Sequence, residues 1–309
     1  MKKWVFKAVI QKTISFLPYK HHLNLLFQTY VTKGVQLSNA YFEDKLIHFK
    51  QHNQFRKKYL SSQPGWSALE IGTGWYPVVP ICCFLAGAKE ITSVDLSRLT
   101  NKEKLKTTLS AFINGQQKGQ LKDYFQIDPH RWAIIKDIYA NYDNTSFEEV
   151  CQQLHFNYLV TDARKLPLKD NSIEFILSNN TFEHIYEDIL KDILREFNRV
   201  LTTDGLMSHF IDMSDHFAHL DQSITIYNFL KYSPEEWDRI DNSIQPQNRL
   251  RISHFREIYK DLRIPITEEV NRPGDVELVK SLPIHSYLKA IPSEDIAISH
   301  CYLASSSKE

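Results

Sequence analysis

From residue 66 onward, the chain alternates short apolar runs with longer, helix-length segments. The apolar runs are four or five residues long, as is typical of strands in a parallel sheet that is buried on both faces. We predict strands of this kind at residues 68–71, 91–94, 157–161 and 173–177. Helices are predicted at residues 77–86 and 188–200. This alternation indicates an α/β fold with a mostly parallel sheet.

The first part of the chain has a different pattern. Residues 1–62 lack strand alternation and are predicted to form a helical cap before the main domain at residues 63–309. Pro18 separates a first helix from a second helical segment around residues 22–32, and a third helix covers about residues 41–60.

A long stretch, residues 98–156, separates the second predicted strand from the third. A plain connection between a strand and a helix is far shorter, so this stretch is interpreted as an insertion. Its amphipathic segments predict helices at residues 102–114, 131–140 and 147–154. We expect the insertion to act as a lid or as an element that sets substrate specificity.

The part of the chain after residue 200 predicts a fifth strand just beyond Asp204 and Gly205. A helix is then predicted at residues 254–262, and two further strands are predicted at residues 264–270 and 296–304. Acids and histidines are concentrated at the start of residues 212–255. We therefore expect this segment to face a substrate.

The first predicted strand ends in an acid and two glycines, Glu70, Gly72 and Gly74, and the second ends in Asp95. The first glycine permits a tight turn, and the second lets the backbone approach a ligand closely. An acid at the end of the next strand can accept hydrogen bonds from ribose hydroxyls. This layout predicts a site for a nucleotide-type cofactor. A carboxylate at Glu70 suits a cationic cofactor better than an anionic pyrophosphate.

Further motifs follow the third and fourth strands. They are Asp162–Ala163, Ser178-Asn179-Asn180, Phe182-Glu183-His184, and the run 195–201 that leads to Asp204-Gly205. With these motifs, residues 66–212 resemble the class I S-adenosylmethionine-dependent methyltransferases, in the broad small-molecule branch. Residues 1–60 and 212–255 resemble methyltransferases of surface-glycan or secondary-metabolite biosynthesis. One departure is Tyr76, which stands where the family has a third glycine.

The resemblance implies a Rossmann-like, seven-stranded, mostly parallel sheet with helices on both faces. It implies S-adenosyl-L-methionine as cofactor and S-adenosyl-L-homocysteine as product. The cofactor contacts that it implies come from Glu70, Gly72, Thr73, Gly74, Tyr76, Asp95, Leu96, Asp162, Ala163, Ser178 and Asn179. The residues expected to contact the substrate are Tyr41, Asn180, Asp212, Asp221, Asn228, Arg249 and Arg251.

Transfer of a methyl group to a hydroxyl requires a base, and histidine suits that role near neutral pH. The candidates are His184, His216 and His219. His216 and His219, together with neighbouring acids, could instead ligate a divalent metal, although no metal is assigned. Arg249 and Arg251 could bind a substrate carboxylate or phosphate through forked hydrogen bonds.

The overall composition narrows the choice of partner and compartment. Lys and Arg total 37, as do Asp and Glu, and this zero net charge argues against a nucleic-acid partner. Adjacent Cys82 and Cys83 indicate buried thiols in a reducing compartment, so we expect a cytoplasmic location. No apolar run is long enough for a transmembrane segment. Residues 1–17 are basic and amphipathic, which predicts a helix packed on the domain or, alternatively, contact with a membrane surface.

The predicted function is therefore an enzyme, an S-adenosylmethionine-dependent methyltransferase that acts on the hydroxyl of a small molecule or glycan. Two alternatives remain open at this stage: an N-methyltransferase of an amine-bearing metabolite, and a scaffold that binds the cofactor without catalysis.

Overall fold

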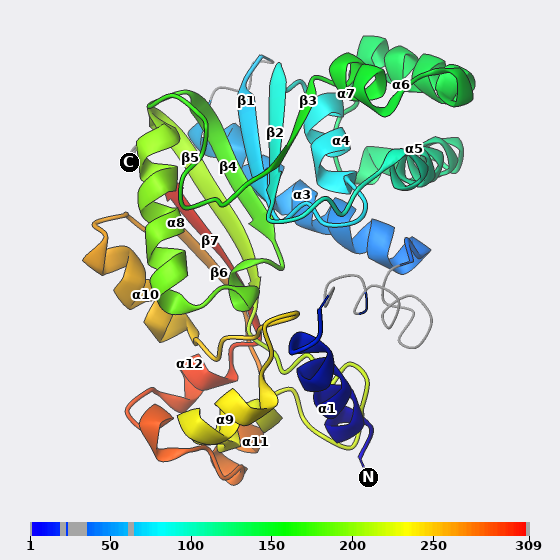
Figure 1. Cartoon of the computed structure of the whole chain (residues 1–309). Helices are drawn as coiled ribbons and strands as arrows, with labels where there is room; N and C mark the ends of the chain where they lie inside the picture. The colour runs from blue at the N-terminus through cyan, green and yellow to red at the C-terminus, as the bar shows by residue number, and fades with distance from the viewer. Residues whose placement is uncertain (1, 19–22, 24–35, 61–64, 307–309) are drawn as a thin grey trace. The chain divides into compact units, whose positions relative to one another are not determined.

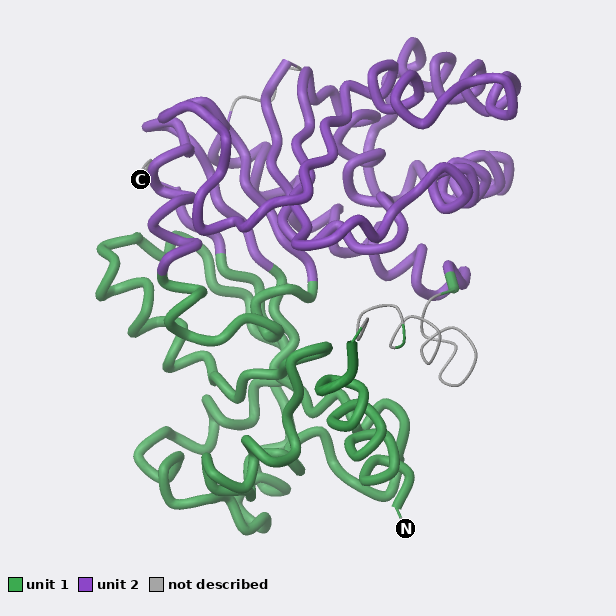
Figure 2. The backbone as a smooth tube through the Cα atoms, viewed as in Figure 1, with its two compact units in different colours: residues 1–36, 180–191, 210–303 green, residues 37–179, 192–209, 304–309 purple. Residues whose placement is uncertain are grey.

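The computed structural model describes residues 2–18, 23, 36–60 and 65–306. The second predicted helical segment, around residues 22–32, therefore lies outside the described residues. The chain divides into two compact units, which Figure 2 shows in green and purple. Unit 1 comprises residues 1–36, 180–191 and 210–303, and unit 2 comprises residues 37–179, 192–209 and 304–309.

A seven-stranded sheet forms in the order β3-β2-β1-β4-β5-β7-β6, with helices around it (Figure 1). The strands are β1 (Ser67–Ile71), β2 (Glu90–Asp95), β3 (Phe156–Val160), β4 (Ile173–Asn179), β5 (Leu201–Asp212), β6 (Glu268–Arg272) and β7 (His300–Ser306). This is the predicted Rossmann-like fold, and the four strands expected from the short apolar runs are all present.

The central strands are parallel, as predicted. Strand β1 pairs with β2 on one side and with β4 on the other, and β2 pairs with β3. Every residue of β1 is buried, including Ser67 and Glu70, as expected of a strand that is covered on both faces. The strand order reverses between β1 and β4, and ligands of open α/β sheets bind beyond the carboxyl ends of strands at such a point.

Four helices of unit 2 begin at residues whose side chains cap them. Ser38 accepts a hydrogen bond from the backbone of the first turn of α3, Asn101 does the same for α5, and Asp128 for α6. Ser146 forms a capping box at the start of α7. The helices are α3 (Asn39–Tyr59), α4 (Val78–Leu85), α5 (Lys102–Gln117), α6 (Pro129–Asn141) and α7 (Phe147–Gln153), with η2 (Leu121–Asp123) and η3 (Tyr142–Asn144). The three helices expected in the insertion are thus present.

Helix α8 (Glu187–Val200) connects β4 to β5. The other helical elements belong to unit 1. They are α1 (Lys3–Ser15), α9 (Pro234–Ile240), α10 (Ile252–Asp261), α11 (Val276–Ser281) and α12 (Ser293–Ala297), with η4 (Phe182–His184), η5 (Asn228–Lys231) and η6 (Ser286–Leu288). Two of the three helical segments expected in an N-terminal cap are described, and they fall in different units, α1 in unit 1 and α3 in unit 2.

The last two strands begin later than the sequence predicts. Strand β6 starts at Glu268 rather than at residue 264, and Pro265 in the skipped stretch has no N–H to donate to a sheet. Strand β7 starts at His300 rather than at residue 296, because α12 occupies the expected beginning. Two acids in the first turn of α12, Glu294 and Asp295, favour that helix.

Helix α1 packs within unit 1. Trp4 and Ala8 are buried in an apolar cluster, and the Trp4 ring lies 5.8 Å from that of Phe217. The Trp4 backbone N–H donates to the Asp221 carboxylate over 3.2 Å. This agrees with the prediction of a helix packed on the domain. Of the described helices, none is long and apolar enough to cross a membrane. The four cysteines are buried and free.

Candidate functional site

The loop after β1 has the geometry that its glycines predict. Gly72 and Gly74 have φ values of 76° and 72°, in the left-handed region that favours glycine. The Gly72 N–H donates to the carbonyl of Val94 in β2 over 2.9 Å. The Thr73 hydroxyl donates to the Glu70 carboxylate over 2.7 Å. The turn therefore brings the end of β1 against the end of β2.

Asp95, the last residue of β2, reaches the same loop. Its Oδ2 accepts hydrogen bonds from the Gly74 N–H over 3.2 Å and from the Tyr158 hydroxyl over 3.1 Å. The Tyr158 hydroxyl in turn accepts from the Leu99 N–H over 3.1 Å. Tyr158 was not among the residues expected at the site. Its role depends on the pairing of β2 with β3, which no local motif in the sequence reveals.

Glu70 and Asp95 are buried acids in a shared environment. Burial raises the pKa of each to about 7. The hydroxyl of Tyr158 and the N–H of Gly74 oppose the rise at Asp95, whereas the nearby charge of Glu70 adds to it. Such a pair favours a ligand that brings positive charge and hydrogen-bond donors, because both would compensate ionised carboxylates.

Helix α3 adds side chains to this pair of acids. Burial raises the pKa of the Tyr41 phenol, and the charges of Glu70 and Asp95 raise it further. Lys45, one turn along the helix, has its ammonium 5.4 Å from the centre of the Tyr41 ring, and its charge opposes the rise in the pKa of Glu70. Tyr41 was predicted as a substrate contact, whereas Lys45 was not predicted.

A buried chain of hydrogen bonds orients Asn179 at the end of β4. The Ser208 hydroxyl lies 2.6 Å from Nδ1 of His52, and Nε2 of His52 lies 3.0 Å from Oδ1 of Asn179. Since the amide oxygen only accepts, Nε2 carries the proton. The Asn179 side chain also forms a hydrogen bond to Glu70, which helps to oppose the rise in the pKa of that acid. Sequence reasoning missed His52, which is 127 residues away from Asn179.

The remaining expected cofactor residues differ in their surroundings. Leu96 is 80% exposed, which is unusual for a leucine and leaves its side chain available to a flat apolar ligand. Asp162 forms an ion pair with Arg164 over 2.6 Å, while Ala163 is buried. Ser178 is buried with its hydroxyl 2.9 Å from Nδ1 of His209. Tyr76 is half-buried.

These residues fit a cationic nucleoside cofactor. The loop offers glycine backbone close to the end of β1, Asp95 offers a buried acceptor for ribose hydroxyls, and Glu70 offers a countercharge. A separate cavity of about 480 Å³ lies between α3 and the insertion helices α5 and α6. Its described lining includes Glu43, Lys106 and Tyr124 but none of the expected cofactor residues.

In unit 1, Asp212 at the end of β5 is surrounded by imidazoles. Its Oδ2 lies 3.3 Å from Nε2 of His216 and 3.7 Å from Nε2 of His219, and its Oδ1 lies 3.4 Å from Nε2 of His300. Burial would raise the pKa of Asp212, but His216 and His219 outweigh it and hold that pKa well below the usual range. Asp212 in turn raises the pKa of His219.

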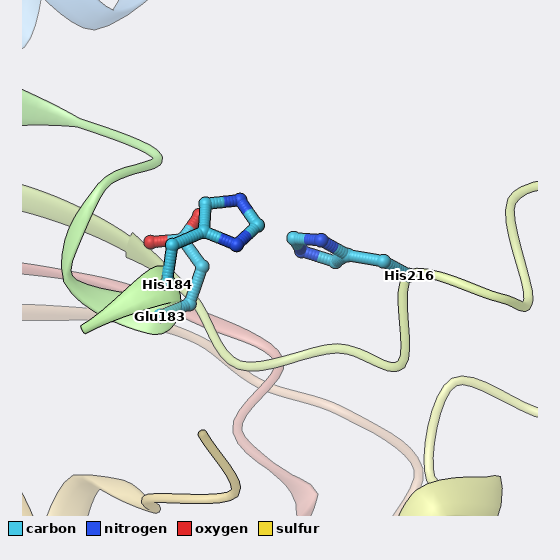
Figure 3. A group of neighbouring side chains, drawn as sticks. All are labelled: Glu183, His184 and His216. Atoms are coloured by element: carbon cyan, nitrogen blue, oxygen red, sulfur yellow. The ribbon is translucent and has the colours of Figure 1, made fainter. Parts of the chain in front are cut away.

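His184 and His216 lie with their rings toward one another, and Glu183 stands beside His184 (Figure 3). The ring centres are 5.0 Å apart. Nδ1 of His184 lies 2.7 Å from the carbonyl oxygen of Pro246, so Nδ1 carries the proton and Nε2 keeps its lone pair. Burial, followed by the neighbouring His216, lowers the pKa of His184 to about 4.

Several expected substrate contacts are occupied inside unit 1. Arg251 is fully buried and donates to the carbonyls of Met213, Ile296 and Ile298. Arg249 donates to the carbonyls of Phe229, Tyr232 and Ser233. Asn228 donates to Asp215 over 3.2 Å and accepts from Lys231 over 2.7 Å. Asp221 accepts from the N–H groups of Trp4 and Ser223.

Asn180 begins the connection after β4. It has a φ of 53°, in the left-handed region where asparagine is tolerated, and its N–H donates to the carbonyl of Phe210 over 3.1 Å. Its side chain is half-buried. The backbone turn at Asn180 therefore leads the chain directly from the end of β4 to Glu183 and His184.

Part of the chain matches a known protein family. Residues 118–208 match the family described as "Methyltransferase domain". The matched segment covers β3, β4, α8 and the first residues of β5, and it begins downstream of Glu70 and Asp95. A comparison with curated proteins gives no match.

Several solved structures are similar to the chain. Geranyl diphosphate methyltransferase in complex with SAM shares 12% identity, with 87% of this chain and 91% of that chain covered and a TM-score of 0.45. A SAM-dependent methyltransferase from Aquifex aeolicus shares 12% identity, with 87% and 98% covered and a TM-score of 0.39. The YcgJ protein from Bacillus subtilis shares 14% identity, with 86% and 99% covered and a TM-score of 0.42.

The family match indicates which reaction the fold supports, namely methyl transfer. A parallel sheet whose order reverses between β1 and β4 supplies the frame, and the matched segment includes Asp162, Ser178 and Asn179. Residues 118–208 therefore match a methyltransferase domain, and this match supports an enzyme that transfers methyl groups.

Proposed function

We propose that the protein transfers the methyl group of S-adenosylmethionine to a hydroxyl of a small molecule or glycan. In this reaction the bond between the methyl carbon and sulfur breaks as the bond to oxygen forms, and the hydroxyl proton passes to a base. A neutral amine would attack without such a base. The observation that carries the proposal is therefore a positioned base.

His184 is the base we propose. The carbonyl of Pro246 fixes its tautomer over 2.7 Å and leaves the lone pair on Nε2. A fixed tautomer keeps a proton acceptor in place through the reaction. In the sequence, His184 follows the end of β4 at Asn179 by only five residues. His216 and His219 are the further candidates, and both face Asp212.

The proposed cofactor site uses the loop between β1 and α4. We assign Glu70 as the countercharge to the cationic end of the cofactor and Asp95 as the acceptor for the ribose hydroxyls. Gly72, Thr73, Gly74 and Tyr76 form the loop wall, and the exposed side chain of Leu96 supports this arrangement. Asp162, Ala163, Ser178 and Asn179 complete the proposed set.

In unit 1, the proposed acceptor contacts are Asn180 and Asp212. Tyr41, in unit 2, stays a contact predicted from the sequence. Asp221, Asn228, Arg249 and Arg251 are left out because their polar groups already hold backbone or side-chain partners within unit 1. The insertion, residues 98–156, remains the proposed specificity element. The cavity of about 480 Å³ that it forms with α3 supports this assignment.

The test measures transfer of a labelled methyl group to two matched panels, one of sugars and other hydroxyl compounds and one of amines. The proposal predicts turnover on a hydroxyl acceptor that His184→Gln removes while cofactor binding stays intact. Lys260→Ala, at an exposed position on α10, is the control and should keep full turnover. Turnover confined to amines, or cofactor binding with no turnover on any acceptor, would instead support one of the two alternatives.

A further inference from the structure

A carboxylate and imidazoles from separate parts of unit 1 converge at the end of β5. Asp212 is the last residue of β5, His216 and His219 lie in the turn that follows, and His300 is the first residue of β7. The ligand atoms of Asp212, His216 and His219 all lie within 4.8 Å of one another. Mixed nitrogen and oxygen donors of this kind bind divalent transition metals in proteins.

The spacing matches the size of a coordination sphere. Zinc binds imidazole nitrogen and carboxylate oxygen at about 2.1 Å, which separates ligands of a tetrahedral site by about 3.4 Å. The separations from Oδ2 of Asp212 to Nε2 of His216 and of His219 are 3.3 Å and 3.7 Å. The side chains thus need only small rotations to place their donor atoms around one ion.

The carboxylate is held in the orientation that such a site needs. Its Oδ1 accepts from the Ser214 N–H over 2.8 Å and lies 3.4 Å from Nε2 of His300, so Oδ2 is the oxygen turned toward His216 and His219. Outer groups of this kind orient metal ligands. Nε2 of His216 is buried, and the carboxylate of Asp212 lies 3.3 Å from it.

The cluster is open on one side. The Asp212 side chain is 8% exposed and that of His216 is 18% exposed, whereas that of His219 is 61% exposed. An ion could enter past His219, and one coordination position would face the solvent. In metal enzymes an open position receives a water or a substrate oxygen.

We propose that Asp212, His216 and His219 bind a divalent transition-metal ion of the Zn²⁺ type. If the proposed function holds, the open position would take the acceptor hydroxyl, ease loss of its proton and leave Nε2 of His184 to receive it. This last role rests on the proposed function, but binding of the ion does not. A second group, Glu183, His184 and His216, also lies within 4.8 Å, so variants must separate the two groups (Figure 3).

The test is a titration of the tag-free, chelator-treated full chain with Co²⁺, followed through the visible absorption of the bound ion. No cofactor or acceptor is present, so the outcome is independent of methyl transfer. The proposal predicts one ion per chain. Asp212→Asn and His219→Ala should each weaken binding by at least about tenfold, since even outer groups around a metal are worth that much.

Two controls make the outcome decisive. His184→Gln should change the affinity by less than about threefold because His184 belongs to the other group. His130→Ala should leave the affinity unchanged. Of these variants, His219→Ala is the least prone to misfold, because the His219 side chain is 61% exposed to solvent. No saturable absorption below about 1 mM Co²⁺, or equal binding by His219→Ala and the unaltered chain, would overturn the proposal. So would loss of binding in His184→Gln alone.

Discussion

Glu70 and Asp95 in unit 2 and Asp212 in unit 1 are buried carboxylates with opposite electrostatic surroundings. In unit 2, burial raises the pKa of Glu70 and Asp95 to about 7. In unit 1, three imidazoles contact Asp212, and those of His216 and His219 hold its pKa well below the usual range despite burial. Glu70 and Asp95 lack enough nearby positive charge to offset their burial. Asp212 is surrounded by imidazoles, which can become positively charged or bind a metal together with it.

The difference indicates what each region is built to receive. Acids that burial keeps partly protonated can be ionised by a cationic ligand and by hydroxyl donors, as a sulfonium nucleoside would provide. An ionised acid among imidazoles does not need such a ligand, but it can join them around a metal ion. The two regions should therefore respond independently to substitution.

The largest effect is expected on the rate of methyl transfer when His184, the proposed base, is substituted. His184→Gln should lower the rate of methyl transfer by at least about 100-fold, the low end of what general-base catalysis contributes. Cofactor affinity should stay within about threefold. Single-turnover rates with the hydroxyl acceptor, measured beside a calorimetric cofactor titration, check both expectations. Equal losses in rate and cofactor affinity would show that His184 has no separate catalytic role.

A smaller loss is expected at the ribose acceptor. Asp95→Ala should weaken binding of S-adenosylhomocysteine by at least about tenfold, because each hydrogen bond to a charged group contributes about 1.5–3 kcal/mol. Titration calorimetry measures the change directly. Asp162→Ala is a useful companion, since that acid is paired with Arg164 and its loss should cost less. Unchanged affinity in Asp95→Ala would reject the assignment.

The pH dependence of cofactor binding should have a defined sign. The ionised forms of Glu70 and Asp95 bind the cationic donor, so affinity is greatest above pH 7 and falls as the pH drops through the folded-state pKa values of about 7. We expect a loss of roughly tenfold for each pH unit below 7 per acid that must be ionised. Binding titrations between pH 5.5 and 8 check this, with Glu70→Gln as the isosteric variant that flattens the profile. Affinity that rises on acidification would contradict it.

The smallest effect is expected on cofactor affinity when histidines beside Asp212 are substituted. His216→Ala and His219→Ala should leave cofactor affinity within about threefold, below 1 kcal/mol, while methyl transfer falls. The comparison of kcat with cofactor affinity in the same preparation separates the two readouts. Full turnover in both variants would make the cluster architectural and leave His184 as the remaining base candidate.

The sequence predicts those parts of the molecule that depend on neighbours along the chain. The loop from Glu70 to Gly74 is set by glycine conformations, and Asp95 simply ends a strand. The insertion helices are set by local caps such as Asn101 and Asp128. These signals lie within a few residues of the structure that they specify.

The sequence does not predict what tertiary packing decides. His300 meets Asp212 only because β7 runs beside β5, and His52 reaches Asn179 across unit 2. Arg251 was expected at a substrate carboxylate, but the carbonyls of Met213, Ile296 and Ile298 surround it in the core. A charged residue carries the same local signal whether it later meets a ligand or a buried carbonyl.

The most direct test of the central claim is a crystal structure of the protein with bound S-adenosylhomocysteine. We predict that the ribose hydroxyls lie within hydrogen-bonding distance of the Asp95 carboxylate and replace its contacts with the Gly74 N–H and the Tyr158 hydroxyl. The amino acid portion should lie at the loop that contains Gly72 and Gly74. A nucleoside bound elsewhere, with Asp95 still bonded to Gly74 and Tyr158, would contradict the claim.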